Sequence, residues 1–369
     1  MIFKKGEFFN GPGGIALGAR MATVTDKNGI EYRVEHEWSN DIDESACKTF
    51  IHNICPDRPE SVINQDVREL DIDSLTPIDA FTFGFPCNDY SLVGEKKGLH
   101  GSYGPLYTYG VKVLRKFKPK WFIAENVSGL TSANEGQAFN LIMKELIESG
   151  YRVTPHLYRF QDYGIPQTRH RVIIVGIRDD LGLEYKVPAP THGENRLPYK
   201  TAKQALTDKP IPPDASNNEP TNHTAKVKEF LHHIPQGENA WYEGIPEELR
   251  LNVKGTKMSQ IYRRLREDYP AYTVTGSGGG GTHIYHWSEP RALTNRERAR
   301  LQTFPDDFIF LGGKEKVRQQ IGMAVPPEGA KIIIEAILKT FAGIEYDFIE
   351  SKWNAQEYAD KVLYEGVLV

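Results

Sequence analysis

The segment Gly6-Glu7-Phe8-Phe9-Asn10-Gly11-Pro12-Gly13-Gly14-Ile15-Ala16 decides the fold. A strand-like start runs directly into a turn in which Gly11, Gly13 and Ala16 satisfy the loose G-x-G-x-x-G/A pattern. Small residues at such a turn let a nucleotide cofactor approach the backbone at the N-terminus of the next helix. A plain tight turn has the same composition, so this loop alone is compatible with either interpretation.

Strand-like and helix-like segments alternate outward from this loop as far as about residue 178. Four further strand-like runs are short, rich in aromatic and β-branched residues, and bounded by Gly, Pro or charge: Tyr32-Arg33-Val34-Glu35, Asp79-Ala80-Phe81-Thr82-Phe83, Lys120-Trp121-Phe122-Ile123-Ala124 and Arg171-Val172-Ile173-Ile174-Val175. Residues 135–149 place apolar side chains at helical spacing before Gly150. The alternation is typical of βαβ units and predicts an α/β fold built on a parallel sheet.

A change in composition indicates a linker or domain edge after this region. Seven of the 23 prolines fall between residues 186 and 220, where periodicity is weak. A strand is predicted at residues 272–275, followed by a glycine run at 278–281 that permits close approach of a partner. Thr294 and Glu297 form a predicted capping box for a helix through Leu301, and a last helix is predicted from near Pro326-Pro327 to Phe341.

The overall composition is that of a soluble globular protein, with 39% hydrophobic and 25% charged residues and a net charge of −4. No apolar run reaches the length of a membrane span, and the N-terminus has no signal-peptide core. We therefore expect a cytoplasmic protein without a membrane partner. The total charge indicates no polyanionic partner, but residues 250–300 hold ten basic and four acidic side chains, which predicts a basic stripe.

The three cysteines, Cys47, Cys55 and Cys87, show no C-x-x-C spacing, so we expect neither a disulfide framework nor a metal site. Cys47 falls on an amphipathic helical segment and Cys55 in the turn after it, where a free cysteine behaves as a small buried hydrophobe. Cys87 differs because it follows Pro86 at the end of a strand-like run, where parallel-sheet enzymes place their chemistry. Its polar surroundings suit a partly exposed thiolate nucleophile.

Two acidic residues stand where a cofactor ribose could bind. Glu37 follows the second strand-like run, about 24 residues after Gly13, and Asp66 ends another such run. A carboxylate at the end of the second strand can accept both ribose hydroxyls, in an adenosyl cofactor as well as in NAD. Trp38 could stack on an adenine. Solvated loop positions for the acids and core packing for Trp38 are the alternatives.

Glu125 emerges from an apolar strand-like run, where a carboxyl group must be paired or protonated. It is therefore a candidate proton donor, with a structural role in capping a neighbouring loop as the alternative. Arg169 and Arg171 precede a strand, and alternation would place both on one face, where they could bind a phosphate or a base carbonyl. Charge protecting a strand edge is the alternative interpretation.

Eight segments, in this order, resemble the motifs of the cytosine-5 DNA methyltransferase family. They span nearly the whole chain: Phe9-Asn10-Gly11-Pro12-Gly13-Gly14, Glu37-Trp38, Asp66, Gly84-Phe85-Pro86-Cys87, Glu125-Asn126-Val127, Gln167-Thr168-Arg169-His170-Arg171, Arg291-Ala292-Leu293-Thr294 through Leu301-Gln302-Thr303-Phe304-Pro305, and Gly322-Met323-Ala324-Val325-Pro326-Pro327. Each is weak alone, but eight in register are specific.

The resemblance implies a Rossmann-like methyltransferase sheet with a smaller target-recognition domain. Residues 1–185 would form the catalytic and S-adenosylmethionine-binding domain, residues 186–290 the target-recognition domain, and residues 291–369 a return to the catalytic domain. It implies that Cys87 attacks carbon 6 of a cytosine flipped out of double-stranded DNA. Glu125 would hold the N3 and amino edge of the ring, and Arg171, supported by Arg169, would bind its carbonyl.

The resemblance also implies binding residues. Those at the cofactor would be Phe9, Gly11, Gly13, Gly14, Glu37, Trp38, Asp66, Pro86 and Leu106. Those at the DNA would be Thr273, Val274, Gly278 and Gly279. The positions that depart from the usual family pattern are Asn88, Tyr103, Pro105 and Met323.

Three alternatives stay open from the sequence. An RNA (tRNA) cytosine-5 methyltransferase would use the same chemistry, and a catalytically silent DNA-binding relative would keep the fold. An NAD-dependent oxidoreductase built on the glycine loop would leave Cys87, Glu125 and the two arginines without a joint role. The family further implies a bacterial restriction-modification enzyme that acts as a monomer, with a separate restriction endonuclease as its possible companion.

Overall fold

The computed structural model describes residues 1–86, 106–253 and 255–364 of the chain. By their internal contacts these residues form two compact units. Unit 1 comprises Met1–Arg159, His170–Ala189 and Pro327–Val369, and unit 2 comprises Phe160–Arg169 and Pro190–Pro326. Within the described part of the chain, no helix is long and apolar enough to cross a membrane.

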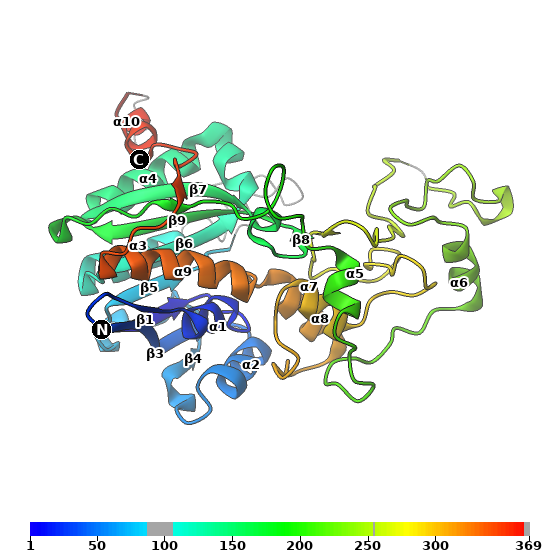
Figure 1. Ribbon diagram of the computed structural model, residues 1–369, viewed down its shortest axis with the longest axis horizontal. Coiled ribbons are helices and arrows are strands. Elements are labelled where there is room, and N and C mark those ends of the chain that lie inside the picture. The colour runs from blue at the N-terminus through cyan, green and yellow to red at the C-terminus, as the bar shows by residue number, and fades with distance from the viewer. Residues whose placement is uncertain (87–105, 254, 365–369) are drawn as a thin grey trace. The chain divides into compact units, whose positions relative to one another are not determined.

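Unit 1 is built on one eight-stranded sheet (Figure 1). Its strands are β1 (Ile2–Phe8), β2 (Thr23–Thr25), β3 (Glu31–Asp41), β4 (Val62–Asn64), β5 (Ala80–Phe83), β6 (Trp121–Val127), β7 (Tyr151–Arg159) and β9 (His170–Arg178). The order across the sheet is β2-β3-β1-β5-β6-β9-β7, and β4 also pairs with β3. A separate antiparallel ribbon joins β10 (Val187–Pro188) to β12 (Phe348–Ile349).

The sheet is mixed rather than parallel. β1 is parallel to β3 and β5, β3 to β4, and β5 to β6, as the βαβ pattern predicted. The prediction is wrong for β9, which is antiparallel to both β6 and β7. The cause is β7, which the alternation pattern did not predict because Pro155 interrupts it. Proline removes a backbone donor, and it is tolerated there because β7 is an edge strand.

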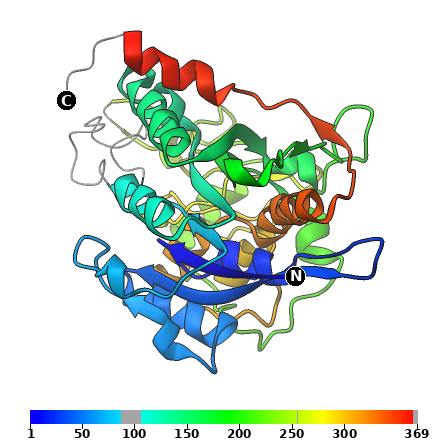
Figure 2. The ribbon, with the colours of Figure 1, turned by 90° about the vertical axis from the view of Figure 1, so that its left-hand side faces the viewer.

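Helices cover both faces of this sheet (Figure 2). They are α1 (Gly14–Met21), α2 (Glu44–Ile54), α3 (Tyr107–Phe117), α4 (Gln137–Glu148), α9 (Pro327–Ala342) and α10 (Ala355–Tyr364). Phe3, on one face of β1, packs against Phe341 of α9 with ring centroids 5.0 Å apart. Phe8, on the other face, joins the buried core that includes α3 and α4. Because side chains alternate along β1, the strand contributes apolar side chains to the packing on both faces of the sheet.

Several predicted helical features of unit 1 are confirmed. α4 buries Phe139, Ile142, Met143 and Leu146, and the chain leaves it through Gly150 at a φ of 91°. α9 begins at Pro327, in agreement with the start predicted near Pro326-Pro327, because proline is suited to a first helical turn. Cys47 and Cys55 are buried and free, on α2 and at its C-cap. Burial raises the pKa of the Cys47 thiol to about 12, so it is an inert core residue.

Unit 2 has little regular structure. Its main elements are β8 (Gln167–Thr168), β11 (Ala271–Tyr272), α5 (Ala202–Thr207), α6 (Ala225–His232), α7 (Asn295–Leu301) and α8 (Lys314–Met323). The predicted capping box of Thr294 and Glu297 is confirmed at the start of α7. The strand predicted at residues 272–275 is too long, because β11 ends at Tyr272 and the Val274 N–H donates to the Gln167 side chain instead (3.0 Å).

Candidate active site

Most of the predicted site residues of unit 1 lie at the carboxyl ends of its parallel strands. The glycine loop follows β1, the turn Gly84-Phe85-Pro86 follows β5, and Glu125 lies near the end of β6. Arg171 enters from the start of β9, whose antiparallel direction brings it opposite Val127 at the same edge. In open α/β sheets this edge is the usual position of ligands and chemistry.

Glu125 and Arg171 form an ion pair. Arg171 Nε donates to Glu125 Oε1 at 2.9 Å, and the two side chains are only 14% and 13% exposed. A Cβ on Gly84 would lie 3.2 Å from Glu125 Oε2, so the turn after β5 approaches the carboxylate closely. Two opposite charges are thereby held beside this turn, one able to accept and one able to donate hydrogen bonds to a planar ring.

Asn126 fixes the turn that leads to the predicted nucleophile. It is 2% exposed, and its side-chain amide donates to the Phe85 carbonyl at 3.2 Å. Phe85 is itself buried, with its ring 6.1 Å from that of Tyr107 on α3. Cys87 lies outside the described residues, as do Asn88, Tyr103 and Pro105. The role of Cys87 as nucleophile therefore stays a prediction.

The glycine loop is shaped for close approach of a ligand. Gly11 has a φ of 51°, and a Cβ there would meet nothing within 4 Å. Gly13 is the N-cap of α1 at a φ of 99°, and a Cβ there would lie 3.0 Å from the Phe50 ring. Only glycine adopts such angles without strain. α1 has neither a side-chain cap nor an acidic residue in its first turn, so its N-terminus can attract an anionic group.

Asp41, which was not among the predicted residues, contacts this loop directly. It is the last residue of β3, and its Oδ2 accepts from the Gly11 N–H at 2.8 Å while Oδ1 accepts from the Asp43 N–H at 2.9 Å. Burial raises the pKa of Asp41, and the donated N–H groups oppose that rise. Asp43 is the side-chain N-cap of α2, and this capping signal could have placed the strand end at Asp41.

The structure does not support Glu37 and Trp38 as cofactor residues. Both lie inside β3, before its end. Glu37 accepts from Thr76 Oγ1 at 3.1 Å and pairs with Lys4 at 3.6 Å, and both partners lie near the opposite edge, where β1 and β5 begin. Trp38 is 3% exposed and packs among aromatic rings of the core, including Phe8 at 5.5 Å. A ring so enclosed has no free face for an adenine.

The other predicted cofactor residues of unit 1 lie in varied settings. Asp66 follows β4, and Arg68 Nε donates to both of its oxygens at 2.9 and 3.0 Å, which holds the pKa of the Asp66 carboxyl below its usual range. Phe9 is partly buried against the core at a φ of 57°. Leu106 is buried at the N-cap of α3. Pro86 is partly exposed. The role of these four residues in cofactor binding stays a prediction.

A buried ion pair in β1 was also not predicted. Lys5 and Glu7 are 1% and 2% exposed and bonded to each other, and Lys5 Nζ also lies 3.3 Å from Thr82 Oγ1 of β5. Burial raises the pKa of Glu7, and the charge of Lys5 opposes the rise. Loss of one partner would leave a buried, uncompensated charge, which typically costs about 3–5 kcal/mol.

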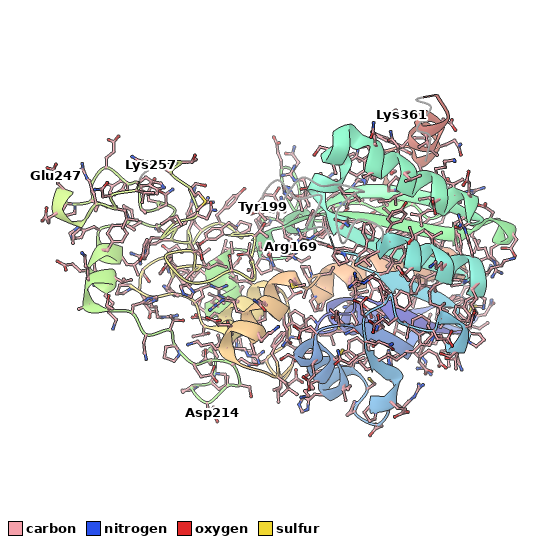
Figure 3. All side chains as sticks on the ribbon, turned by 180° about the vertical axis from the view of Figure 1, so that it is seen from behind. Arg169, Tyr199, Asp214, Glu247, Lys257 and Lys361 are labelled. Carbon is pink, nitrogen blue, oxygen red and sulfur yellow. The ribbon has the colours of Figure 1, made fainter. Side chains whose placement is uncertain are left out.

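Arg169 belongs to unit 2, and its setting differs from the prediction. It is fully buried, and its guanidinium donates to the carbonyls of Val274 and Gly322, each at 3.0 Å (labelled in Figure 3). It lies between β8 and β9 rather than within a strand, so alternation does not apply to it. These two contacts hold the backbone of unit 2, and the predicted role of Arg169 in supporting Arg171 stays a prediction.

The predicted DNA-contact residues of unit 2 divide into two groups. Val274 is fully buried, so its side chain is not presented as predicted, whereas Thr273 is partly exposed and its Oγ1 donates to the Thr168 carbonyl at 2.7 Å. Gly278 is partly exposed and Gly279 is exposed. Met323, at the end of α8, is 74% exposed. Thr273, Gly278 and Gly279 are therefore at least partly accessible, and their contact with DNA stays a prediction.

The sheet, glycine loop and polar strand ends of unit 1 are those of a Rossmann-like α/β fold with a candidate ligand site at the carboxyl edge of its parallel strands. Comparison with known proteins gives the family. Residues 3–339 match the model for C-5 cytosine-specific DNA methylase. The chain therefore belongs to the C-5 cytosine-specific DNA methylase family, and it is a DNA cytosine-5-methyltransferase. The resemblance drawn from the eight segments is confirmed.

Individual relatives agree along the whole chain. The type II methyltransferase M.BbvI of Brevibacillus brevis is 63% identical over 375 residues, covering 100% of this chain and 99% of the relative. The type II methyltransferase M.NgoFVII of Neisseria gonorrhoeae is 42% identical, covering 90% of this chain and 86% of the relative. A crystal structure of an E. coli prophage protein assigned as a DNA modification methyltransferase has a TM-score of 0.70 at 23% identity, covering 92% and 99% of the two chains. This last likeness confirms the fold.

Proposed function

We propose that the protein transfers a methyl group from S-adenosylmethionine to carbon 5 of a cytosine that is flipped out of a specific double-stranded DNA sequence. The observation that carries the proposal is the Glu125–Arg171 pair beside the turn that leads to Cys87. A cytosine presents an N3 and amino edge and a carbonyl, which match a carboxylate and a guanidinium respectively.

The residues around the glycine loop fit S-adenosylmethionine, which would supply the methyl group. The partly buried carboxylate of Asp41 would accept the ribose hydroxyls, in place of the Glu37 predicted from sequence. Ile42, which follows it and is 68% exposed, would cover the adenine in place of Trp38. The open backbone at Gly11 and the uncapped N-terminus of α1 would receive the carboxylate of the methionine part.

The chain's own groups can account for the activation of cytosine. The Cys87 thiolate would form a bond from its sulfur to carbon 6, and the ring electrons would then make carbon 5 nucleophilic. Glu125 would hold the N3 and amino edge and favour its protonated form, while Arg171 would bind the ring carbonyl and offset developing negative charge. After carbon 5 accepts the methyl group, its proton leaves and the bond between sulfur and carbon 6 breaks. These steps require the base to leave the duplex.

The two units would divide the work. Unit 1 would carry the reaction, and unit 2 would recognise the target sequence through groove contacts. Since M.BbvI and M.NgoFVII are type II methyltransferases, we further propose that the enzyme acts as a monomer in a restriction-modification system with a separate endonuclease.

Labelled methyl transfer tests the proposal directly. Purified protein is incubated with methyl-labelled S-adenosylmethionine and either duplex DNA or tRNA. We expect label in DNA, at carbon 5 of cytosine, within one sequence that bisulfite sequencing identifies. Label confined to tRNA, or label on another base, would contradict the proposal.

A further inference from the structure

Arg171, the proposed partner of the cytosine carbonyl, has one neighbour on each side in the sheet. It is directly opposite Val127 of β6 on one side and directly opposite Tyr158 of β7 on the other. Residues directly opposite each other in an antiparallel pair carry their side chains on the same face, with Cβ atoms about 4.5–5.5 Å apart. Since side chains alternate along a strand, Glu125 shares this face as well. Tyr158 is therefore an immediate neighbour of the Glu125–Arg171 pair.

The two sides of the Arg171 side chain are held differently. On the β6 side, Arg171 Nε donates to Glu125 Oε1 at 2.9 Å, and Nη1 donates to the His170 carbonyl at 2.7 Å. An arginine has many rotamers, and holding it in one of them requires neighbours on more than one side. Because β9 lies between β6 and β7, the side chain of Tyr158 is the neighbour that limits how far Arg171 can turn away from Glu125.

The Tyr158 ring is fixed by a buried hydrogen bond. Tyr158 is 1% exposed, and its Oη lies 2.8 Å from the Oη of Tyr185, which is 3% exposed. Tyr185 lies in the segment between β9 and β10. A buried hydroxyl that loses its hydrogen bond costs free energy, so the pair restricts the position of both rings.

A second support reaches Tyr158 from the C-terminal part of unit 1. The His156 ring packs edge-on against that of Tyr158, with centroids 5.0 Å apart and an angle of 77° between the planes. His156 Nδ1 accepts from the Lys352 N–H at 3.0 Å, and Ser351 Oγ donates to the Pro155 carbonyl at 2.5 Å. The segment that contains Ser351 and Lys352 thus fixes the histidine beside Tyr158, although β7 is an edge strand.

We propose that Tyr158 is a positioning residue for methyl transfer. Its ring would restrict the Arg171 side chain on the side away from Glu125, and so keep the guanidinium where the cytosine carbonyl binds. Tyr185 and His156 would act on Arg171 only through this ring. Charge stabilisation is most effective when the donor is already in place before the reaction. The inference rests on the proposed role of Arg171 and adds a residue that does not itself touch the substrate.

Two substitutions of Tyr158 test the role of its ring in the full-length protein. Tyr158→Leu removes the ring and leaves room for Arg171 to turn away from Glu125. A misplacement of about 1 Å can cost about 100-fold in rate, so we expect this variant to lower kcat at least about tenfold. Its Kd for S-adenosylhomocysteine should stay close to wild type. Tyr158→Phe keeps the ring, so its kcat should also stay close to wild type.

Tyr151 is the matched control. It is also 1% exposed, it is the first residue of β7, and it is opposite Arg178 at the other end of β9. Its Oη donates to the Pro119 carbonyl at 2.9 Å. Tyr151→Leu should therefore lower the midpoint of urea unfolding, as Tyr158→Leu does, but leave kcat unchanged. A loss of kcat that only followed stability would be equal in the two variants and would contradict the proposal.

A double-mutant cycle tests whether Tyr158 acts through Arg171. Arg171→Lys keeps the charge but loses the planar guanidinium, so it should itself lower kcat. If the proposal is right, Tyr158→Leu lowers kcat at least about tenfold in wild type but less than about threefold in the Arg171→Lys background. Equal factors in the two backgrounds, or a Tyr158→Leu variant with the kcat of wild type, would overturn the inference. Urea unfolding checks that each variant folds, and Tyr158→Met, with its adaptable side chain, replaces Tyr158→Leu if that variant does not fold.

The outcomes separate this inference from the proposed function. The cycle is measured on whichever of duplex DNA and tRNA accepts the methyl label from wild type. Label in DNA with equal factors in the two backgrounds would leave the function standing and refute the role of Tyr158. Label confined to tRNA with the expected coupling would refute the function and support the role of Tyr158. Label in neither nucleic acid, or an Arg171→Lys variant with the kcat of wild type, would contradict both.

Discussion

Replacing Asp41 with asparagine should weaken cofactor binding and, separately, destabilise the protein. The carboxylate accepts from the Gly11 and Asp43 N–H groups at 2.8 and 2.9 Å. Asparagine keeps one oxygen, so one N–H would face an amide donor instead of an acceptor. Hydrogen bonds to a charged group contribute about 1.5–3 kcal/mol each. Because this contact exists without ligand, its loss should lower the free energy of unfolding by that amount.

The effect on binding has a different origin. A ribose hydroxyl that donates to the carboxylate contributes only when the cofactor is bound. Loss of one such charge-assisted bond, about 1.5–3 kcal/mol, should raise the Kd for S-adenosylhomocysteine about 10- to 100-fold. Isothermal titration calorimetry measures this Kd, and urea unfolding without ligand measures the change in the free energy of unfolding.

Glu37→Gln is the matched control for this prediction. Its partners are Thr76 and Lys4, near the opposite edge of the sheet, so the Kd should change by less than about threefold. A large loss of affinity in Glu37→Gln with none in Asp41→Asn would refute the assignment of the ribose-binding acid to the end of β3.

Three further predictions follow from packing and charge. Glu125→Gln should slow methyl transfer at least about 100-fold in an initial-rate assay with little change in cofactor Kd, and an unchanged rate would exclude Glu125 from the reaction. Gly18→Ala should cost about 1–3 kcal/mol in urea unfolding, because its Cβ would lie 2.5 Å from the Pro327 carbonyl oxygen; wild-type stability would contradict this packing. Burial lowers the pKa of His156 from its ordinary 6.5 to about 4, so the unfolded chain binds more protons between these values and stability should fall as pH drops from 6.5 towards 4. When the pH falls from 7 to 5, the free energy of unfolding of His156→Gln should decrease by about 1–2 kcal/mol less than that of wild type. Equal decreases in both proteins would exclude His156 as a cause of the pH dependence.

The fold was predictable as far as local patterns determine it. The strand-like runs, the apolar face of α4, the capping box of α7 and the start of α9 depend on side chains close in sequence, and all are confirmed. β7 was not predicted because it contains Pro155, and proline argues against a strand. The proline is tolerated because β7 lies at the edge of the sheet. The direction of β9 depends on β7, so the antiparallel pairing could not be predicted either.

Site residues that belong to a sequence motif at the end of a short strand could be predicted. The acidic residue at the end of β3 could not, because its position depends on how long that strand is. β3 extends to Asp41 because its last residues pair with both β1 and β4, which are contacts between distant parts of the chain. If β3 had ended at Glu37, that residue would lie at the carboxyl edge of the sheet, where the cofactor is proposed to bind. Burial of Arg169 and Val274 likewise depends on residues more than 100 positions away, such as Gly322 for Arg169.

The proposed reaction depends on a covalent bond between Cys87 and the target cytosine, which Glu125 and Arg171 would hold. The direct measurement uses duplex DNA made with 5-fluorocytosine, which cannot lose its substituent at carbon 5, together with S-adenosylmethionine. Wild type should give a protein–DNA complex that survives denaturing electrophoresis, and Cys87→Ser should give none while its Kd for S-adenosylhomocysteine stays close to wild type. A wild-type enzyme that methylates normal DNA but forms no such complex, or a Cys87→Ser variant that forms it, would contradict the covalent role of Cys87.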